Sequence, residues 1–279
     1  MRRALECIAA DGARMRGVLH EAHPGRYVPG EAALLLPGLV GTRVGPARIQ
    51  VEMADLLASH GISTMRCDPV GTGYSDGDPG STTVASIVRD VGDMLAFLRD
   101  TLGAERFLLG GVCRGAKGAL AASMVHPEVT RLLLVSCPPF RSEDLGKRAA
   151  RRRRYHLRHY ARQLAKPGNL RRLARGEIHL GLVAKTVTRP MAAGALDRMT
   201  LGEGQWEMSS LRARTLFLYG EGDPDYRDSL DTYRTELAGK DETVTFRTIP
   251  EAGAGFYGGD WRTEAVAAVE KWLGGSADV

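Results

Sequence analysis

The feature that most constrains the fold is a cysteine flanked by glycines, Gly111-Val-Cys-Arg-Gly115, at the junction of two different sequence patterns. An apolar run typical of a buried strand, 106–110, precedes it, and a stretch of small residues typical of a packed helix, 116–125, follows it. A strand that turns sharply into a helix through such a glycine-flanked position exposes the central side chain at the strand end. The pattern therefore predicts a strand–turn–helix that presents the Cys113 thiol on the turn.

Strand-like and helix-like patterns alternate along the rest of the chain. Apolar strand patterns occur at 32–36, 62–67, 131–136, 215–219 and 244–249, and amphipathic helix patterns occur at 47–60, 83–102 and 261–273. This alternation predicts an α/β fold with a doubly wound, mostly parallel sheet. A chain of 279 residues can bury one such core without a second one. We predict a core formed by residues 1–140 and 206–279, interrupted by a helical cap insert at 141–205.

Several turn and polar residues follow directly after the predicted strands. They are Pro37, Asp68, Cys113, Ser136, Asp223 and Ala254. Ligands of doubly wound sheets bind beyond the C-terminal ends of the strands. We therefore expect these six positions to meet at one edge of the sheet.

The predicted insert is strongly basic. Residues 141–189 hold 15 Lys/Arg and 3 Asp/Glu, a charge of +12, whereas the rest of the chain holds 23 and 30, a charge of −7. A solvated cap face is one interpretation. The other is a dock for an acidic partner, such as an acyl carrier protein, a CoA or phosphopantetheine thioester, or an anionic lipid surface. The candidate anion-binding residues are Arg151, Arg152, Arg153, Arg154 and Arg158. Nucleic acid is disfavoured, because no known binding motif is present and few aromatics are interleaved.

The four cysteines, Cys7, Cys67, Cys113 and Cys137, show neither metal-ligand spacing nor a disulfide framework. The N-terminus has no apolar run before Asp11, and no stretch reaches the length of a membrane span. These patterns predict a protein of the reducing cytoplasm with no metal, no cofactor, no secretory signal and no transmembrane segment. They leave a homodimer open.

Together these motifs resemble the α/β-hydrolase superfamily, in its serine aminopeptidase or lysophospholipase-like branch. The chain is most similar there to hydrolases associated with exosortase systems, in which a cysteine nucleophile is natural. The motifs that carry the likeness are Val44-Gly45, Arg66–Gly77, Gly111–Gly115, Tyr155–Arg158 and Leu173–Gly176. The resemblance covers roughly residues 30–275 and implies the α/β-hydrolase fold with a cap.

The resemblance also implies roles for individual residues. Cys113 takes the place of the nucleophile, which a helix N-terminus favours as the thiolate. The backbone N–H groups of Arg114 and Leu39 take the place of the oxyanion hole. Asp223 matches the acid that orients the family's histidine, and Ala254 stands where that histidine is expected. Simpler interpretations remain for each of these: an inert buried thiol, a strand-terminating Pro37-Gly38 turn, and a turn aspartate before proline.

The alanine at 254 is the main departure from the family. Without a base, an attacking water has no proton acceptor and a leaving group has no proton donor, although a thiol depends on a base less than a hydroxyl does. The other histidines are poor replacements, because they fall at helix ends, in an early hairpin-like region or in the insert. Three explanations stay open: a substitution engineered to trap a complex, a natural loss with altered chemistry, and a pseudoenzyme.

Two classes of function follow. The first is an enzyme that acts on an ester or thioester acyl group through Cys113, by hydrolysis or by acyl transfer. A variant of it is a lyase-type eliminase of natural-product biosynthesis, similar to the α/β-hydrolase-fold proteins that eliminate acetate in tetronate assembly. The second class is a non-catalytic module that binds an acyl ligand or a partner.

Overall fold

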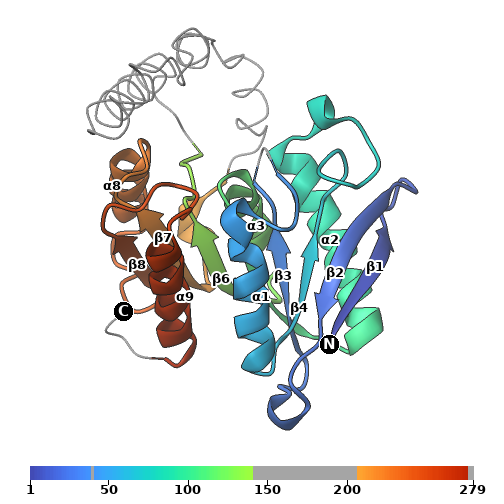
Figure 1. Cartoon of the computed structure of the whole chain (residues 1–279). Helices are drawn as coiled ribbons and strands as arrows, with labels where there is room; N and C mark the ends of the chain where they lie inside the picture. Colours follow the sequence, from blue (N-terminus) through green and yellow to red (C-terminus); the bar gives the residue numbers. More distant parts are fainter. Residues whose placement is uncertain (39–40, 141–205, 276–279) are drawn as a thin grey trace, which may run out of the picture. The chain divides into compact units, whose positions relative to one another are not determined.

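The computed structural model describes residues 1–38, 41–140 and 206–275, which form a sheet with helices on both faces (Figure 1). The strands are β1 (Arg2–Ile8), β2 (Arg14–His20), β3 (Glu31–Leu36), β4 (Ser63–Cys67), β5 (Arg106–Val112), β6 (Val129–Val135), β7 (Arg214–Gly220) and β8 (Val244–Ile249). The α-helices are α1 (Ile49–Ser59), α2 (Val84–Leu102), α3 (Arg114–Val125), α8 (Tyr226–Glu236) and α9 (Gly259–Leu273). Short 3₁₀ turns lie at Pro24–Arg26, Pro46–Arg48, Pro79–Ser81 and Met208–Ser210. The predicted cap insert lies outside the described residues.

The eight strands lie in the order β1-β2-β4-β3-β5-β6-β7-β8. Neighbours among β3 to β8 pair in parallel, and β2 pairs antiparallel with both β1 and β4. The predicted α/β fold with a doubly wound, mostly parallel sheet is confirmed. Because parallel strands end at the same side, the six parallel strands deliver the residues that follow them to one sheet edge.

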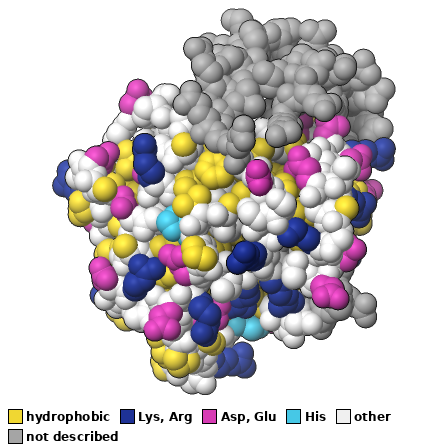
Figure 2. Space-filling model, turned by 180° about the vertical axis from the view of Figure 1, so that it is seen from behind, with side chains coloured by type: hydrophobic (Ala, Val, Ile, Leu, Met, Phe, Trp, Pro, Cys, Tyr) yellow, Lys and Arg dark blue, Asp and Glu magenta, His cyan; other side chains and the backbone are white. Residues whose placement is uncertain are grey.

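Each face of the sheet is covered by its own helices (Figure 1). One buried cluster joins α1 and α9 to the strands through Met53, Leu57, Val269 and Trp272, and the other joins α2, α3 and α8 through Val91, Met94, Leu120, Leu230 and Tyr233. Figure 2 turns the second side toward the reader and shows acidic and basic side chains interspersed over it. Within the described residues, no helix is both long and apolar enough to cross a bilayer.

Three elements are additional to the patterns predicted from the sequence: the strands β1 and β2 and the helix α8. The strand β1 alternates poorly because its side chains are mostly exposed, and it is recognised only through its pairing with β2. The helix α8 is polar and buries only Ser229, Leu230 and Tyr233, so its apolar stripe is too narrow for a periodicity argument. The helix predicted at 47–60 begins at Ile49, because Ala47 and Arg48 adopt positive φ angles.

Candidate active site

Cys113 occupies a strained turn between β5 and α3. Its φ of 54° and ψ of −113° lie in a region that non-glycine residues rarely adopt, at a cost of about 1–3 kcal/mol. The backbone N–H of Cys113 donates to the carbonyl of Val135 at 2.8 Å, and its carbonyl accepts from the N–H of Lys117 at 3.1 Å. The side chain is half-buried. The turn therefore places a partly accessible thiol directly before the N-terminus of α3.

The flanking glycines allow this turn to pack. A Cβ on Gly111 would lie 2.4 Å from the carbonyl carbon of Gly115, and a Cβ on Gly115 would lie 2.3 Å from the carbonyl oxygen of Pro37. Real Cβ atoms do not approach backbone so closely, so both positions need glycine. A Cβ on Gly38 would lie 3.9 Å from the Cβ of Cys113. The Pro37-Gly38 turn thus lies against the cysteine, as an oxyanion loop would.

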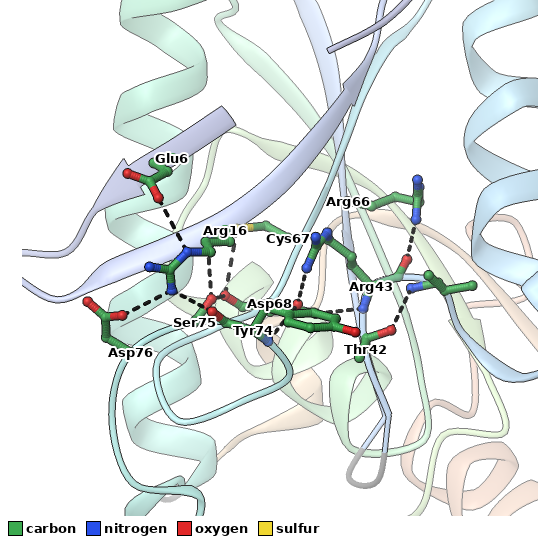
Figure 3. Close-up of polar contacts among 11 residues, drawn as sticks. Glu6, Arg16, Thr42, Arg43, Arg66, Cys67, Asp68, Tyr74, Ser75 and Asp76 are labelled. Carbon is green, nitrogen blue, oxygen red and sulfur yellow. Dashed lines mark hydrogen bonds and ion pairs between the residues drawn. The ribbon is translucent and has the colours of Figure 1, made fainter. Parts of the chain in front are cut away.

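Hydrogen bonds hold the chain on both sides of the Pro37-Gly38 turn. The Nε2 amide of Gln50, which is buried, donates to the carbonyl of Leu36 just before the turn. On the other side, the backbone N–H and the guanidinium Nη1 of Arg43 each contact the fully buried carboxylate of Asp68 at 2.5 Å. Figure 3 shows Arg43 and Tyr74 meeting at Asp68, to which the N–H of Tyr74 donates at 3.2 Å. Leu39, the proposed second oxyanion donor, lies outside the described residues.

Asp68 has a structural role. The sequence pattern predicted its position at the C-terminal edge of the parallel strands but assigned it no function. The contacts with Arg43 tie the loop after β4 to the loop after β3, and within the β4 loop the Oγ of Ser75 donates to the carbonyl of Asp68 at 2.5 Å. A Cβ on Gly73 would lie 2.4 Å from its Oδ2. The signal in the sequence was an aspartate directly after a buried strand and before closely spaced glycines. Its partner, Arg43, lies too far along the chain for a local pattern to reveal.

The loops that carry Asp223 and Ala254 lie side by side. The N–H of Gly222 donates to the carbonyl of Ala252 at 2.8 Å, and a Cβ on Gly220 would lie 2.2 Å from the same oxygen. Asp223 is half-buried, and its Oδ1 accepts from the N–H of Asp225 at 2.9 Å. The acid is therefore a neighbour of the loop on which a base would stand.

Ser136 connects the Ala254 loop to the cysteine side of the edge. It follows β6, the strand beside β5, and its Oγ donates to the carbonyl of Ala254 at 3.2 Å. The neighbouring Val135 carbonyl accepts from the N–H of Cys113, so the last residue of β6 and the residue after it contact both loops. The structure thus gathers Cys113, Ser136, Ala254 and Asp223 at one edge, as the strand-end pattern predicts. Position 254 carries a methyl group, which can neither accept nor donate a proton.

The four histidines within the described residues lie at the opposite edge of the sheet. His20 pairs with Thr64 at the start of β4, and His23 bonds through its N–H to Ala58 near the end of α1. His60 follows α1, and His126 follows α3. His20 is buried between Asp55 and Arg66, and its burial lowers its pKa. None of these four can act on a group held at Cys113.

The other three thiols differ from Cys113. Cys7, Cys67 and Cys137 are buried, and burial raises the pKa of Cys7 to about 11 and that of Cys137 to about 12. Burial also raises the pKa of Cys67 well above its ordinary value. None of the four cysteines, all within the described residues, forms a disulfide. Cys113 is thus the accessible thiol of the set.

The sequence did not point to Lys117, which lies one helical turn after Cys113 and is buried. Its Nζ donates to the carbonyl of Pro139 at 3.0 Å and lies 5.1 Å from the centre of the Phe140 ring. Lys117 therefore ties α3 to the segment that follows β6. The candidate anion-binding residues Arg151, Arg152, Arg153, Arg154 and Arg158 lie outside the described residues.

The sheet order, with a strained, positive-φ residue at the turn between β5 and α3, defines an α/β-hydrolase-fold protein. The profile of the alpha/beta hydrolase fold family matches residues 33–179, more than half of the chain, and the chain belongs to this family. No curated protein matches it in sequence.

Solved structures agree with the fold. The esterase Pf2001 of Pyrococcus furiosus is 14% identical, covers 98% of this chain and 90% of its own, and superimposes with a TM-score of 0.70. Est1E of Butyrivibrio proteoclasticus, solved with ferulic acid bound, is 15% identical over 97% of this chain and 98% of its own, with a TM-score of 0.61. The serine hydrolase XC6422 of Xanthomonas campestris, described as lacking a lid, is 14% identical over 97% and 94%, with a TM-score of 0.61. At these identities the likeness establishes the fold.

Proposed function

We propose that this chain is an enzyme that takes an acyl group from an ester or thioester onto the Sγ of Cys113. The observation that carries the proposal is the strained, positive-φ position of Cys113 between β5 and α3, with the Pro37-Gly38 turn packed against it. Proteins keep such strain where function requires it. The thiolate of Cys113, which has lost its proton to solvent, attacks the carbonyl carbon and forms the S–C bond and a negative oxygen, which the backbone N–H groups of Arg114 and Leu39 would stabilise.

The alanine at 254 restricts which leaving groups can depart readily. When the intermediate collapses, the C–O or C–S bond to the leaving group breaks, and the departing atom takes the electron pair. Position 254 has no histidine that could give the departing atom a proton, so groups that are stable as anions leave best. Thiolates and phenolates are such groups, whereas alkoxides are not. We therefore favour thioesters and aryl esters over alkyl esters as acyl donors.

The second half of the reaction, release of the acyl group from Cys113, depends more strongly on the missing base. Hydrolysis of the acyl-enzyme requires a base to take a proton from water, and the described residues offer no histidine at this edge. Thiols and amines are better nucleophiles than water and need less assistance. We therefore favour acyl transfer over hydrolysis for the chain as written, and the acyl-enzyme should persist when no acceptor is supplied.

The basic insert suggests how a donor could be delivered. Arg151, Arg152, Arg153, Arg154 and Arg158 would dock an acidic donor such as an acyl carrier protein or CoA thioester. Attraction of this kind depends on salt, because surface charges are screened over about 8–10 Å at physiological ionic strength.

The test is to incubate the protein with an acetyl thioester or p-nitrophenyl acetate, quench it in acid, and measure the intact mass and the modified peptide. We expect one acyl group per chain, on Cys113. The matched control is Cys137→Ala, which removes a buried thiol and should leave the adduct in place, whereas Cys113→Ala should remove it. A chain that iodoacetamide alkylates at Cys113, but that no acyl donor modifies, would instead be a binding module.

A further inference from the structure

The side chain of Arg114 is buried without the partners that a guanidinium needs. It is 2% exposed, and its Nη2 donates to the Oγ1 of Thr72 at 3.3 Å. Its Nε and Nη1 are also buried, and neither has a hydrogen-bond acceptor among the described residues. Buried charges in native proteins are normally paired and hydrogen-bonded. The unsatisfied Nε and Nη1 of this buried guanidinium therefore point to a bound group that accepts their hydrogen bonds.

A second buried arginine shows the ordinary solution in the same protein. Arg66 is 5% exposed, and its Nε bonds to the Nε2 of His20 at 2.9 Å. Its Nη1 donates to the carbonyl of Arg43 at 2.6 Å. The donors of Arg66 are thus satisfied by two acceptors of the protein, whereas Arg114 meets, within the described part of the chain, only one neutral hydroxyl.

The location of Arg114 indicates what kind of group would bind. It directly follows Cys113 and begins α3, whose N-terminus adds positive potential. Burial lowers the pKa of Arg114, and negative charge on the sulfur of Cys113 acts in the opposite direction. A guanidinium nevertheless stays protonated in proteins. An anion held here would lie close to the reacting sulfur.

We propose that Arg114 and Thr72 form an anion site for a carboxylate carried by the acyl donor, so that the enzyme prefers acidic acyl groups such as half-thioesters of dicarboxylic acids. The inference rests on the proposed acylation of Cys113. A single guanidinium with one hydroxyl matches the single charge of a carboxylate better than the double charge of a phosphate. Charge-assisted hydrogen bonds from arginine are the usual means of recognising a carboxylate.

The first experiment separates this site from acyl chemistry by using two alkylating reagents. Iodoacetate and iodoacetamide form the same S–C bond at Cys113 and release the same iodide, but only iodoacetate carries a charge. We expect the ratio of the iodoacetate rate to the iodoacetamide rate to exceed that of N-acetylcysteine. It should fall about tenfold in Arg114→Gln, the scale of one charge-assisted hydrogen bond. A change in the thiol pKa alone would alter both rates equally and leave the ratio unchanged.

Two variants serve as controls. Arg114→Lys keeps the charge and should retain most of the preference for iodoacetate. Arg212→Gln removes the same charge from an exposed residue that precedes β7, at the edge of the sheet opposite Cys113, and should leave the ratio unchanged. If Arg114→Gln does not fold, the wild-type ratio still decides, because a value equal to that of N-acetylcysteine overturns the inference.

The second experiment uses acyl donors whose carboxylate lies at different distances from the reacting carbonyl. Acylation of Cys113 by the p-nitrophenyl half-esters of succinic and glutaric acid is compared with acylation by p-nitrophenyl butyrate. We expect the half-esters to react faster in the wild type and to lose about tenfold of that advantage in Arg114→Gln. An unchanged alkylation ratio together with an unchanged half-ester preference overturns the anion site. An alkylation preference without any acyl adduct keeps the anion site and overturns the proposed function.

Discussion

The turn after β5 and the loop after β8 meet at the same sheet edge but are built in different ways. The β5 turn holds Cys113 in a strained conformation among glycines that no other residue could replace. The β8 loop is held through backbone carbonyls, at Ala252 and Ala254, and carries no histidine at the position where the family's base is expected. The difference indicates that the two halves of acyl chemistry are separable. A site can retain what captures an acyl group while lacking what releases it.

The largest expected effect contrasts glycines from the two regions. Gly115→Ala forces a Cβ to within 2.3 Å of the Pro37 carbonyl oxygen, so the turn must move. We expect a loss of about 3 kcal/mol in the free energy of unfolding and loss of acyl capture at Cys113. Urea unfolding and intact mass are the measurements.

The matched variant is Gly253→Ala, since a Cβ there would meet nothing within 4 Å. It should change stability by less than about 0.5 kcal/mol and leave capture intact. Equal effects of the two substitutions would show that the β5 turn is no more constrained than the β8 loop.

Supplying the missing base should give the next largest effect. Ala254→His should raise steady-state hydrolysis of p-nitrophenyl acetate at least about a hundredfold, the usual contribution of a general base. Acyl capture should change less, because a thiol needs the base less. Initial rates across pH are the measurement, with Ala254→Gln as a control of similar size. Unchanged turnover would mean that this loop is not the base loop, and would favour altered chemistry or a binding role.

The acid should matter only when the base is present. Asp223→Asn keeps an oxygen that can accept from the N–H of Asp225, so the turn should survive. In the chain as written we expect less than about a twofold change in acyl capture, because there is no histidine to orient. In the Ala254→His background, turnover should fall about tenfold or more. A double-mutant cycle measures this coupling, and additive effects would remove Asp223 from the site.

The smallest effect concerns the loop after β4, which supports Thr72. The buried carboxylate of Asp90 accepts from the N–H of Val70 at 2.9 Å, and its burial raises its pKa to about 7. The folded protein therefore keeps this proton at pH values where the unfolded chain has lost it, and stability from this group falls as pH rises from about 4 to about 7.

Asp90→Asn keeps the acceptor and removes the charge. It should stabilise the protein by about 1 kcal/mol at about pH 8, and the gain should shrink as the pH falls toward about 4. Thermal melts over this range are the measurement. A gain of the same size at every pH would contradict the role of ionisation.

Local patterns were sufficient to predict the six parallel strands and the cysteine turn, but not the antiparallel strands β1 and β2. The glycine-flanked cysteine and the residues after the strands were correctly predicted to lie at one edge of the sheet. Parallel strands bring their C-terminal ends to the same edge, and this does not depend on side-chain packing. The partners of Asp68 and Arg114 could not be predicted in this way. Arg43 and Thr72 lie 25 and 42 residues away from them along the chain, and only folding brings these side chains together. The polar helix α8 was missed because it buries three residues.

We infer that Cys113 captures an acyl group which the chain then releases slowly. Capture followed by slow release is tested most directly by rapid-mixing measurement of p-nitrophenolate release from p-nitrophenyl acetate, with acid-quenched mass spectra taken at the same times. We expect a burst close to one equivalent per chain, a matching acyl adduct on Cys113, and a slow phase that a thiol acceptor accelerates. Steady release without a burst, unchanged in Cys113→Ala, would contradict it.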